Sequence, residues 1–301
     1  MMRHNYVNNK LFTQLLLSSI PESKERNIQE KEYDFTLLIP AFNEGENILR
    51  TVSLAVKILS NMPFTFEVIV VDDGSSDGTL EIISAASRMY PNVRVVSNGR
   101  NMGKGYALMR GFKLSKGRIV AFLDADLEIS PSLILEYISI LEEKGADVVV
   151  GSKRHPQSEV NYPLRRKILS IAYMILLKIL FRMNISDAQF GLKVFRSHVL
   201  RLILPHVKIK RFAFDVEVLL YASLVGFNIV EAPVKLDYKG KTKVSLREIC
   251  QMLLDTVRVA LRVYLRRIGL KAVLKGGAGR SLLGHSLVQL ARHRESICRR
   301  S

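Results

Sequence analysis

Three carboxylates follow a short apolar run in the stretch AFLDADLEIS, residues 121–130. The run predicts a buried strand, and Asp124 and Asp126 would share a face of an extended chain because they are two residues apart. Carboxylates are costly to bury unless a cation meets them, and their oxygens suit a hard divalent ion such as Mg²⁺ or Mn²⁺. We therefore expect a metal site at Asp124, Asp126 and Glu128, completed by a substrate phosphate. The structural alternative is a solvated turn before a helix that begins near Pro131.

The elements that must position these carboxylates can be predicted from the pattern of apolar residues. Short apolar strands alternate with amphipathic helices, and the strands are expected over residues 35–39, 66–71, 93–97, 118–123 and 146–151. This alternation indicates an α/β fold, with a mostly parallel, Rossmann-like sheet and helices on both faces. Asn43 and Glu46 also fit a capping box for a helix that ends near Leu59.

Polar clusters fall where three of these strands end. They are Asn43–Glu44, Asp72–Asp73 and Asp124–Asp126. Ligands of parallel α/β sheets bind beyond the carboxyl ends of the strands, so the convergence of these clusters predicts a binding site there.

The charge of the chain is concentrated in its second half. The net charge of +17 divides into −3 for residues 1–152, +11 for 153–211, −2 for 212–240 and +11 for 241–301. A basic half suggests a polyanion, an anionic membrane or a phosphorylated substrate as partner. Aromatic residues do not interleave the basic ones in a stacking pattern, so we expect no nucleic acid.

Two basic helices are expected in this half. Residues 164–183 form one whose central ten residues, 168–177, are uncharged. That run is too short to span a bilayer, and it suits equally a helix lying in a membrane interface or a core helix of a second layer. Residues 251–270 carry Arg258, Arg262 and Arg266 at four-residue intervals between apolar residues, which favours a helix on a membrane surface.

Cysteine use and the start of the chain indicate the compartment. Cys250 and Cys298 form neither a disulfide framework nor a metal-ligand spacing, so a reducing, cytosol-facing location is expected. The first residues show a basic flank and a very short apolar patch, which does not fit a secretory signal.

Eight motifs resemble one family in order and spacing. IPAFNEGENI, VVDDGSSDGT, NMGKGYALMRG and LDADLE resemble the GT-A glycosyltransferases of family 2. VVVGSKRH, SDAQFGLKVF, RFAFDVEVLLYASLVGFNIVEAPV and KGKTKVS resemble its polyprenyl-phosphate sugar synthases, most of all the dolichyl-phosphate β-glucosyltransferases and next the dolichyl-phosphate mannose synthases. The resemblance covers about residues 35–270.

The residue pattern and this resemblance together predict a domain organisation, in which the two ends of the chain are assigned from their composition alone. Residues 1–34 are a flexible lead-in and 35–245 a GT-A catalytic domain, with a nucleotide-sugar half at 35–151 and an acceptor half at 152–245 that includes the interface helix 164–183. Residues 246–270 form the basic amphipathic helix and 271–301 a basic tail.

The resemblance also implies site residues. The donor set is Pro40, Phe42, Glu44, Val71, Asp73, Asp124, Ala125, Asp126 and Lys243. The acceptor set is Lys153, Arg165, Arg166, Asp187 and Gln189, and the catalytic set is Asp124, Asp126 and Asp215. Glu128 stands where many mannose synthases have Gln, and Lys153 where the family often has Arg. Lys243 should close over the donor diphosphate, with an ordinary lysine in a basic loop as the alternative.

Asp215 and Glu217 resemble an acidic pair near the acceptor in this superfamily. In relatives with a hydroxyl acceptor, one such carboxylate is the base. Here we favour organisation of the acceptor loop, with an N-cap role for Asp215 as the alternative.

These residues favour a membrane-associated, inverting transferase on the cytoplasmic face. It would move a hexose, glucose before mannose, from a nucleoside-diphosphate sugar to a polyprenyl or dolichyl phosphate, with Mg²⁺ or Mn²⁺. An ionised lipid phosphate needs positioning cations rather than a general base. Two alternatives stay open: a family 2 transferase with a glycan hydroxyl acceptor, and a non-catalytic basic protein that binds lipid or nucleic acid. The chain has no Trp, so the QxxRW signature of processive members is absent. An oligomer or partner subunit is compatible with the sequence.

Overall fold

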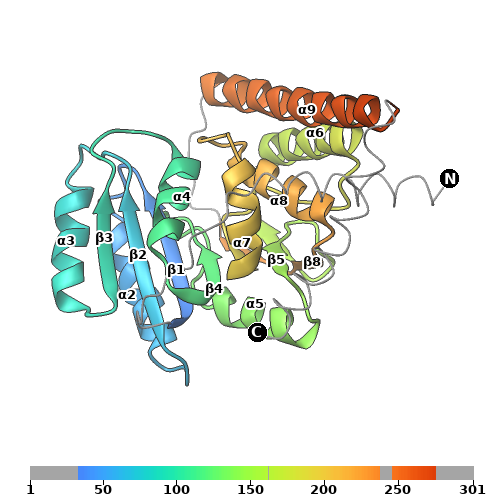
Figure 1. Cartoon of the computed structure of the whole chain (residues 1–301). Helices are drawn as coiled ribbons and strands as arrows, with labels where there is room; N and C mark the ends of the chain where they lie inside the picture. The colour runs from blue at the N-terminus through green and yellow to red at the C-terminus, as the bar shows by residue number, and fades with distance from the viewer. Residues whose placement is uncertain (1–32, 162, 238–245, 276–301) are drawn as a thin grey trace.

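A seven-stranded, mostly parallel sheet forms the centre of the protein (Figure 1). The computed structural model describes residues 33–161, 163–237 and 246–275. The strand order is β3-β2-β1-β4-β7-β5-β8, and only β7 runs antiparallel to its neighbours among these strands. The strands are β1 Tyr33–Ala41, β2 Phe66–Asp72, β3 Val93–Ser97, β4 Gly117–Phe122, β5 Val148–Gly151, β7 Lys193–Arg196 and β8 Ile229–Ala232.

Helices cover both faces of this sheet, which confirms the predicted α/β class. One core joins the sheet to α2 (Ile48–Leu59), α3 (Thr79–Met89) and α5 (Leu133–Glu143). The other core joins it to α4 (Lys104–Leu114), α7 (Ser197–Ile203) with the 3₁₀ turn η1 (Leu204–His206), and α8 (Phe214–Val225). The central strands β1 and β2 carry runs of consecutive apolar residues, such as LLI in β1 and VIVV in β2, because both of their faces are covered.

The predicted capping box at Asn43 and Glu46 is wrong. Helix α2 begins only at Ile48, with Asn47 as its N-cap residue and no side-chain cap bond. Asn43 instead has a left-handed backbone, with φ 54°, and its side-chain oxygen accepts a bond of 2.9 Å from the Ser76 N–H. Asn43, which the pattern assigned to a helix end, therefore connects the loop after β1 to the loop after β2.

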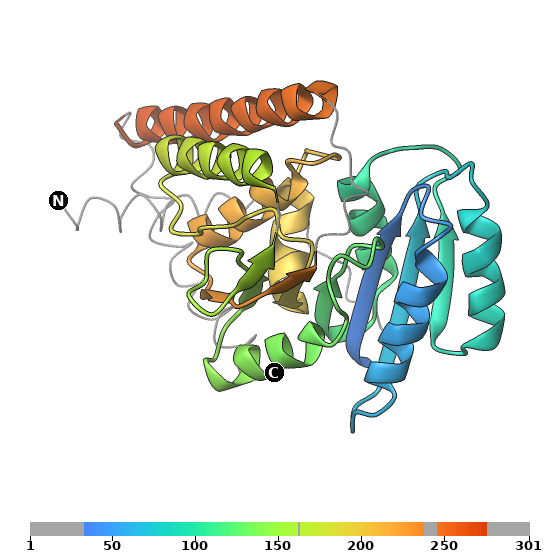
Figure 2. The ribbon, with the colours of Figure 1, turned by 180° about the vertical axis from the view of Figure 1, so that it is seen from behind.

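Two further helices form a layer outside α8. Helices α6 (Leu164–Phe181) and α9 (Leu246–Lys275) lie side by side in both views (Figures 1 and 2). The Tyr173 hydroxyl of α6 is 2.7 Å from the Thr256 hydroxyl of α9, and both side chains are buried. A small parallel sheet of β6 (Glu159–Asn161) and β9 (Lys235–Asp237) lies beside the main one.

The boundaries of the expected segments differ slightly from the structure. The interface helix ends at Phe181 rather than 183, because Arg182 turns left-handed with φ 55°. The basic helix runs to Lys275, so residues 271–275 belong to it rather than to the expected tail. Residues 33 and 34 belong to β1 rather than to the lead-in. The other residues of the lead-in and of the tail lie outside the described residues.

Candidate active site

The carboxyl ends of β1, β2 and β4 bring the three predicted polar clusters to one edge of the sheet. Asp73 follows β2 and is 3% exposed. Its carboxylate accepts bonds from the Asn98 side chain at 2.7 Å, the Met102 N–H at 3.0 Å and the Gly103 N–H at 2.7 Å. Asp73 therefore holds the loop that leads into α4, and this carboxylate organises the donor side of the edge.

The other predicted donor residues differ in their solvent exposure. Phe42 is 44% exposed, whereas the side chains of Val71 and Ala125 are 1% and 4% exposed and pack in the two cores. Any contact of Val71 or Ala125 with a ligand would therefore come from the backbone. The Ala125 carbonyl already accepts a bond of 2.7 Å from the Thr51 hydroxyl, which fixes the loop after β4 to α2.

Glu44 completes the donor side, and Pro40 precedes it in β1. The Glu44 N–H donates to the Thr79 hydroxyl at 2.9 Å. Burial raises the pKa of the Glu44 carboxyl, the bond from the Asn47 side chain opposes this, and the negative charge of Asp124 adds to it. The protonation of Glu44 is therefore coupled to the charge of the carboxylates after β4.

The loop after β4 holds Asp126 in a strongly negative environment. Burial, and then the charge of Asp124, raise the pKa of Asp126 to about 7. The Glu128 N–H donates to the Asp126 carboxylate at 3.0 Å, and Leu127 between them has φ 59°. A left-handed backbone at a leucine is a strained conformation that surrounding structure must maintain, and such strain clusters at functional sites.

Two lysines that the sequence reasoning did not assign compensate part of this charge. The Lys104 ammonium, at the start of α4, is 2.6 Å from the Asp124 carboxylate and 3.6 Å from that of Asp215. Lys193, at the start of β7, is 1% exposed and lies 2.9 Å from the other oxygen of Asp215. Both lysines stand in motifs quoted above, Lys104 in NMGKGYALMRG and Lys193 in SDAQFGLKVF, where they could have been noticed.

The charge states of this cluster follow from its geometry. Burial alone would raise the pKa of the Asp215 carboxyl, but Lys193 and Lys104 hold it below its usual value. Burial lowers the pKa of Lys193, whereas for Lys104 the pull of Asp124 and Asp215 outweighs burial and raises the pKa. Asp215 is thus an ionised carboxylate locked between two ammonium groups, which makes it a positioning group and a poor proton acceptor.

The predicted N-cap role of Asp215 is not observed. Helix α8 has Ala213 as its N-cap residue, and Asp215 and Glu217 lie in its first turn. Negative charge near a helix N-terminus is favourable, so the helix stabilises both carboxylates.

Three of the predicted acceptor residues, Lys153, Asp187 and Gln189, lie together beyond β5. The Lys153 ammonium is 2.8 Å from the Asp187 carboxylate and 5.6 Å from the centre of the Phe190 ring. The Gln189 side-chain amide lies 2.7 Å from the Met252 sulfur of α9. Arg165 and Arg166 lie in the first turn of α6, and Lys243 lies outside the described residues.

Arg154 is a second cation of this region that the sequence reasoning did not single out. Its guanidinium donates to the Ser186 carbonyl at 2.6 Å and to the Ser170 hydroxyl of α6 at 2.8 Å. It therefore joins the loop after β5, the loop before β7 and α6.

The segment 186–192 also touches the metal-site residues directly. A Cβ atom added to Gly191 would lie 2.2 Å from an oxygen of Asp124. A side chain at position 191 would require Asp124 or the loop to shift, so the segment 186–192 is in close contact with the first carboxylate of DAD.

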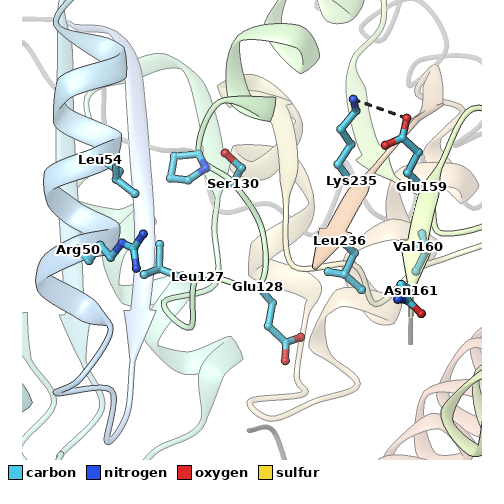
Figure 3. Close-up of a pocket in the computed structure, with 11 residues that line it drawn as sticks. Arg50, Leu54, Leu127, Glu128, Ser130, Glu159, Val160, Asn161, Lys235 and Leu236 are labelled. Carbon is cyan, nitrogen blue, oxygen red and sulfur yellow. Dashed lines mark ion pairs between the residues drawn. The ribbon is translucent and has the colours of Figure 1, made fainter. Parts of the chain in front are cut away.

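A pocket of about 600 Å³ opens on the other side of the loop after β4 (Figure 3). Arg50 and Leu54 of α2 form one wall, and β6 with β9 forms the opposite wall, where Lys235 is 3.6 Å from Glu159. Glu128 lies on the loop between these walls. The pocket leaves space beside Glu128, one of the expected metal ligands.

The donor set for a divalent ion is only partly formed. Within residues 33–161, 163–237 and 246–275, no three His, Cys, Asp or Glu side chains are arranged to hold a metal ion, so Asp124, Asp126 and Glu128 do not make a three-ligand set here. Asp124 and Asp126 nevertheless fit such an ion, because their mutual repulsion raises the pKa of Asp126 and an additional positive charge would relieve it. Two carboxylates with substrate phosphates are a normal shell for Mg²⁺.

The outer layer exposes an apolar surface next to the acceptor residues. On α6, its exposed members are Leu164, Ile168, Leu169, Ile171, Ile175, Ile179 and Leu180. On α9, they are Leu253, Leu254, Val257, Leu261, Tyr264 and Leu265. Each helix buries another side, since Tyr173, Leu177, Val259 and Val263 belong to the core. The core interpretation of residues 164–183 therefore holds for the buried side of α6, and the interface interpretation stays a prediction for its exposed side. None of the described helices is both long and apolar enough to cross a bilayer.

Comparison with known proteins agrees with this architecture. Residues 36–204 match the family described as Glycosyl transferase family 2. A dolichyl-phosphate beta-glucosyltransferase of Trichomonas vaginalis is 30% identical over 237 residues, which cover 75% of this chain and 70% of the relative. One of Dictyostelium discoideum is 30% identical over 244 residues, which cover 76% of this chain and 75% of the relative.

A solved structure supports the fold. The glucosyl-3-phosphoglycerate synthase of Mycobacterium tuberculosis, in complex with Mn²⁺, uridine-diphosphate and glucosyl-3-phosphoglycerate, superposes with a TM-score of 0.58 at 21% identity. The match covers 79% of this chain and 80% of that one. The likeness confirms the predicted GT-A architecture.

Proposed function

Since the chain belongs to glycosyl transferase family 2, and is therefore a glycosyltransferase, we propose that it transfers glucose from a nucleoside-diphosphate sugar to a polyprenyl or dolichyl phosphate. The names of two relatives at 30% identity support glucose over mannose and a dolichyl phosphate as acceptor. Family membership removes the alternative of a non-catalytic binding protein.

The observation that carries the lipid acceptor is the contact between the acceptor residues and the exposed apolar helices. Arg154 is bonded to Ser170 of α6, and Gln189 contacts Met252 of α9. A polyprenyl phosphate needs cations for its phosphate and an apolar surface for its chain. Lys153 and Arg154 offer the first beside the second, and we place the protein on the cytoplasmic face of a membrane with α6 and α9 toward the lipid.

The state of Asp215 argues against a glycan hydroxyl as acceptor. A hydroxyl needs a base to take its proton, and Asp215 is ion-paired to Lys193 and Lys104 with a lowered pKa. A lipid phosphate is already ionised near neutral pH and needs no such base. The lysine pair and Asp215 serve to hold Asp124 in place.

The donor would lie against the ends of β1, β2 and β4, with its diphosphate beside Asp124 and Asp126. A Mg²⁺ or Mn²⁺ ion held by these carboxylates would neutralise charge on the departing diphosphate. Lys104 supplies a fixed positive charge at the same edge, and Lys243 is proposed to close over the diphosphate. In-line attack by the lipid phosphate would invert the anomeric carbon and yield a β-linked product from an α-linked donor.

A product assay tests the proposal. The full chain is incubated with polyprenyl phosphate and Mg²⁺ or Mn²⁺, and offered UDP-glucose, GDP-mannose and UDP-N-acetylglucosamine in separate reactions. We expect lipid-extractable glucose from UDP-glucose alone, its loss in Asp126→Asn or with EDTA, and its retention in Asp34→Asn, a carboxylate at the opposite end of β1. Product from GDP-mannose would refute the choice of sugar, and turnover only with soluble sugar acceptors would refute the lipid acceptor.

A further inference from the structure

A buried carboxylate connects the outer helix α9 to the active-site edge. Glu217 of α8 is 0% exposed. One of its oxygens accepts bonds from the N–H groups of Lys208 at 2.9 Å and Ile209 at 2.8 Å. Its other oxygen accepts a bond from the Arg262 guanidinium of α9, with which it forms an ion pair.

The segment that Glu217 holds packs against the start of α4. The Lys210 carbonyl accepts a bond of 3.1 Å from the Tyr106 N–H, and the Lys210 ammonium lies 5.3 Å from the centre of the Tyr106 ring. A Cβ atom on Gly103 would lie 2.4 Å from the Lys210 carbonyl oxygen. Residues 208–210 therefore form one wall against which the first turn of α4 is seated, and Lys104 belongs to that turn.

The first turn of α8 carries two carboxylates with different partners: Asp215 points to the candidate site and Glu217 points to α9. Asp215 meets Lys104 and Lys193, whereas Glu217, two residues later, meets Arg262. A Cβ atom on Gly105 of α4 would lie 2.6 Å from Cβ of Phe214, so the first turns of α4 and α8 are in direct contact. A shift of α8 would move Asp215 and Lys104 together.

Arg262 is consequently not a free basic residue of a membrane-facing stripe. Its side chain is 27% exposed, whereas that of Arg258, one turn earlier, is 59% exposed and pairs with Asp255 of its own helix. We propose that Arg262 is a positioning residue for sugar transfer: through Glu217 it holds the first turn of α8 and residues 208–210, and thereby the Lys104–Asp124 pair. Helix α9 is then part of the scaffold of the active site as well as its apolar edge.

A double-mutant cycle tests this coupling. Arg262→Met keeps an unbranched apolar stem and removes the guanidinium with its charge, and should lower kcat about tenfold or more, because small misplacements of catalytic groups are costly. Arg258→Met is the matched control and should leave kcat within about twofold. Glu217→Gln keeps an acceptor for the two N–H groups and removes the charge that needs Arg262. Arg262→Met should therefore cost much less in the Glu217→Gln background.

Two further measurements separate positioning from other roles. The fraction bound to vesicles should be the same for Arg262→Met and Arg258→Met, and hydrogen exchange at the amides of Lys208 and Ile209 should accelerate only in Arg262→Met. Equal kcat in the two variants, multiplicative effects in the cycle, or a loss explained by vesicle binding would overturn the proposal. If Arg262→Met does not fold, Arg262→Gln carries the test: it keeps a polar side chain but removes the charge that pairs with Glu217, and an unchanged kcat would overturn the proposal.

The kinetic part of the test rests on the proposed function for its acceptor, but the exchange measurement does not. A wild-type chain that makes no polyprenyl product would refute the proposed function. Accelerated exchange at Lys208 and Ile209 would still support the coupling in that case, and unchanged exchange would refute it.

Discussion

Lys104 and Asp124 form an ion pair of 2.6 Å that joins helix α4 to the first carboxylate of the DAD motif. Asp215 lies 3.6 Å from the same ammonium and is itself anchored by Lys193. The two halves of the sheet are thus connected at their common edge by alternating charges. Such networks are strongly disrupted when one member is removed, because the remaining charge is left uncompensated.

Replacing Lys104 by Met should lower kcat/KM for the sugar donor about a hundredfold, the order seen when one preorganised charge-stabilising group is removed from a site. The reason is that Asp124 and Asp215 would lose the cation between them. Lys113→Met, at the exposed C-terminal end of α4, is the control and should be near wild type. Steady-state kinetics with varied donor checks this, and equal activity of the two variants would contradict it.

The stability of the metal-free protein should depend on pH through Asp126. Its pKa is about 7 in the folded protein, against an ordinary value of 3.8. A raised pKa means that the folded state binds the proton more tightly than the unfolded state. The contribution of protonated Asp126 to the free energy of unfolding is therefore fully present below about pH 4 and lost as pH rises through about 7. In EDTA, the Tm of wild type should fall relative to Asp126→Asn between about pH 4 and 7. A difference in Tm that stays constant over this range would show that Asp126 does not titrate there.

Gly191→Ala should disturb Asp124. The new Cβ would lie 2.2 Å from a carboxylate oxygen, so either the loop or Asp124 must move. We expect a loss of stability of about 1–3 kcal/mol, as for overpacking, together with reduced transferase activity. Gly145→Asn is the control, because Gly145 has φ 54°, which Asn tolerates, and open space around its Cβ position. Thermal denaturation and the product assay check both, and a fully active Gly191→Ala would refute the close contact.

The apolar faces of α6 and α9 should bind lipid. Leu254 and Leu261 are 55% and 56% exposed and stand seven residues apart, on one side of α9. Leu254→Asp with Leu261→Asp should weaken binding to vesicles at least about tenfold, since burying each leucine is worth about 1.5–3 kcal/mol. Met89→Asp, an equally exposed apolar residue on α3, should bind as wild type does. Sedimentation with vesicles measures this, and unaltered binding of the double variant would place the membrane contact elsewhere.

Local pattern was sufficient to predict five of the seven strands of the sheet, but not β7 and β8, which follow them in the chain. The strand expected at 93–97 is β3, and β1, β2, β4 and β5 lie within two residues of their expected limits, because continuous apolar runs between polar turns have few other ways to be buried. The two-residue spacing of Asp124 and Asp126, at the end of a strand, likewise indicated the active edge of the sheet from residue order alone.

Contacts between distant segments were beyond such reasoning. Asn43 looked like a helix cap but bonds Ser76 of the next loop, and Arg262 looked like part of a basic surface but reaches Glu217. A periodic pattern reports which residues share a face of a helix, but not which face another element covers.

The sequence by itself determined the fold class and the family and predicted the carboxylates of the candidate site, because these depend on residue type and on spacing along the chain. Only the tertiary structure decided the charge state and partners of the site. The charged cluster comes from distant parts of the chain, since its members Lys104, Asp124, Lys193 and Asp215 are as much as 111 residues apart. The packing of α4, α8 and β7 brings each of them within 4 Å of a partner, and only then are their charges coupled. The Coulomb energy of a pair of charges depends on the distance between them and on their burial, and neither quantity can be read from the order of residues.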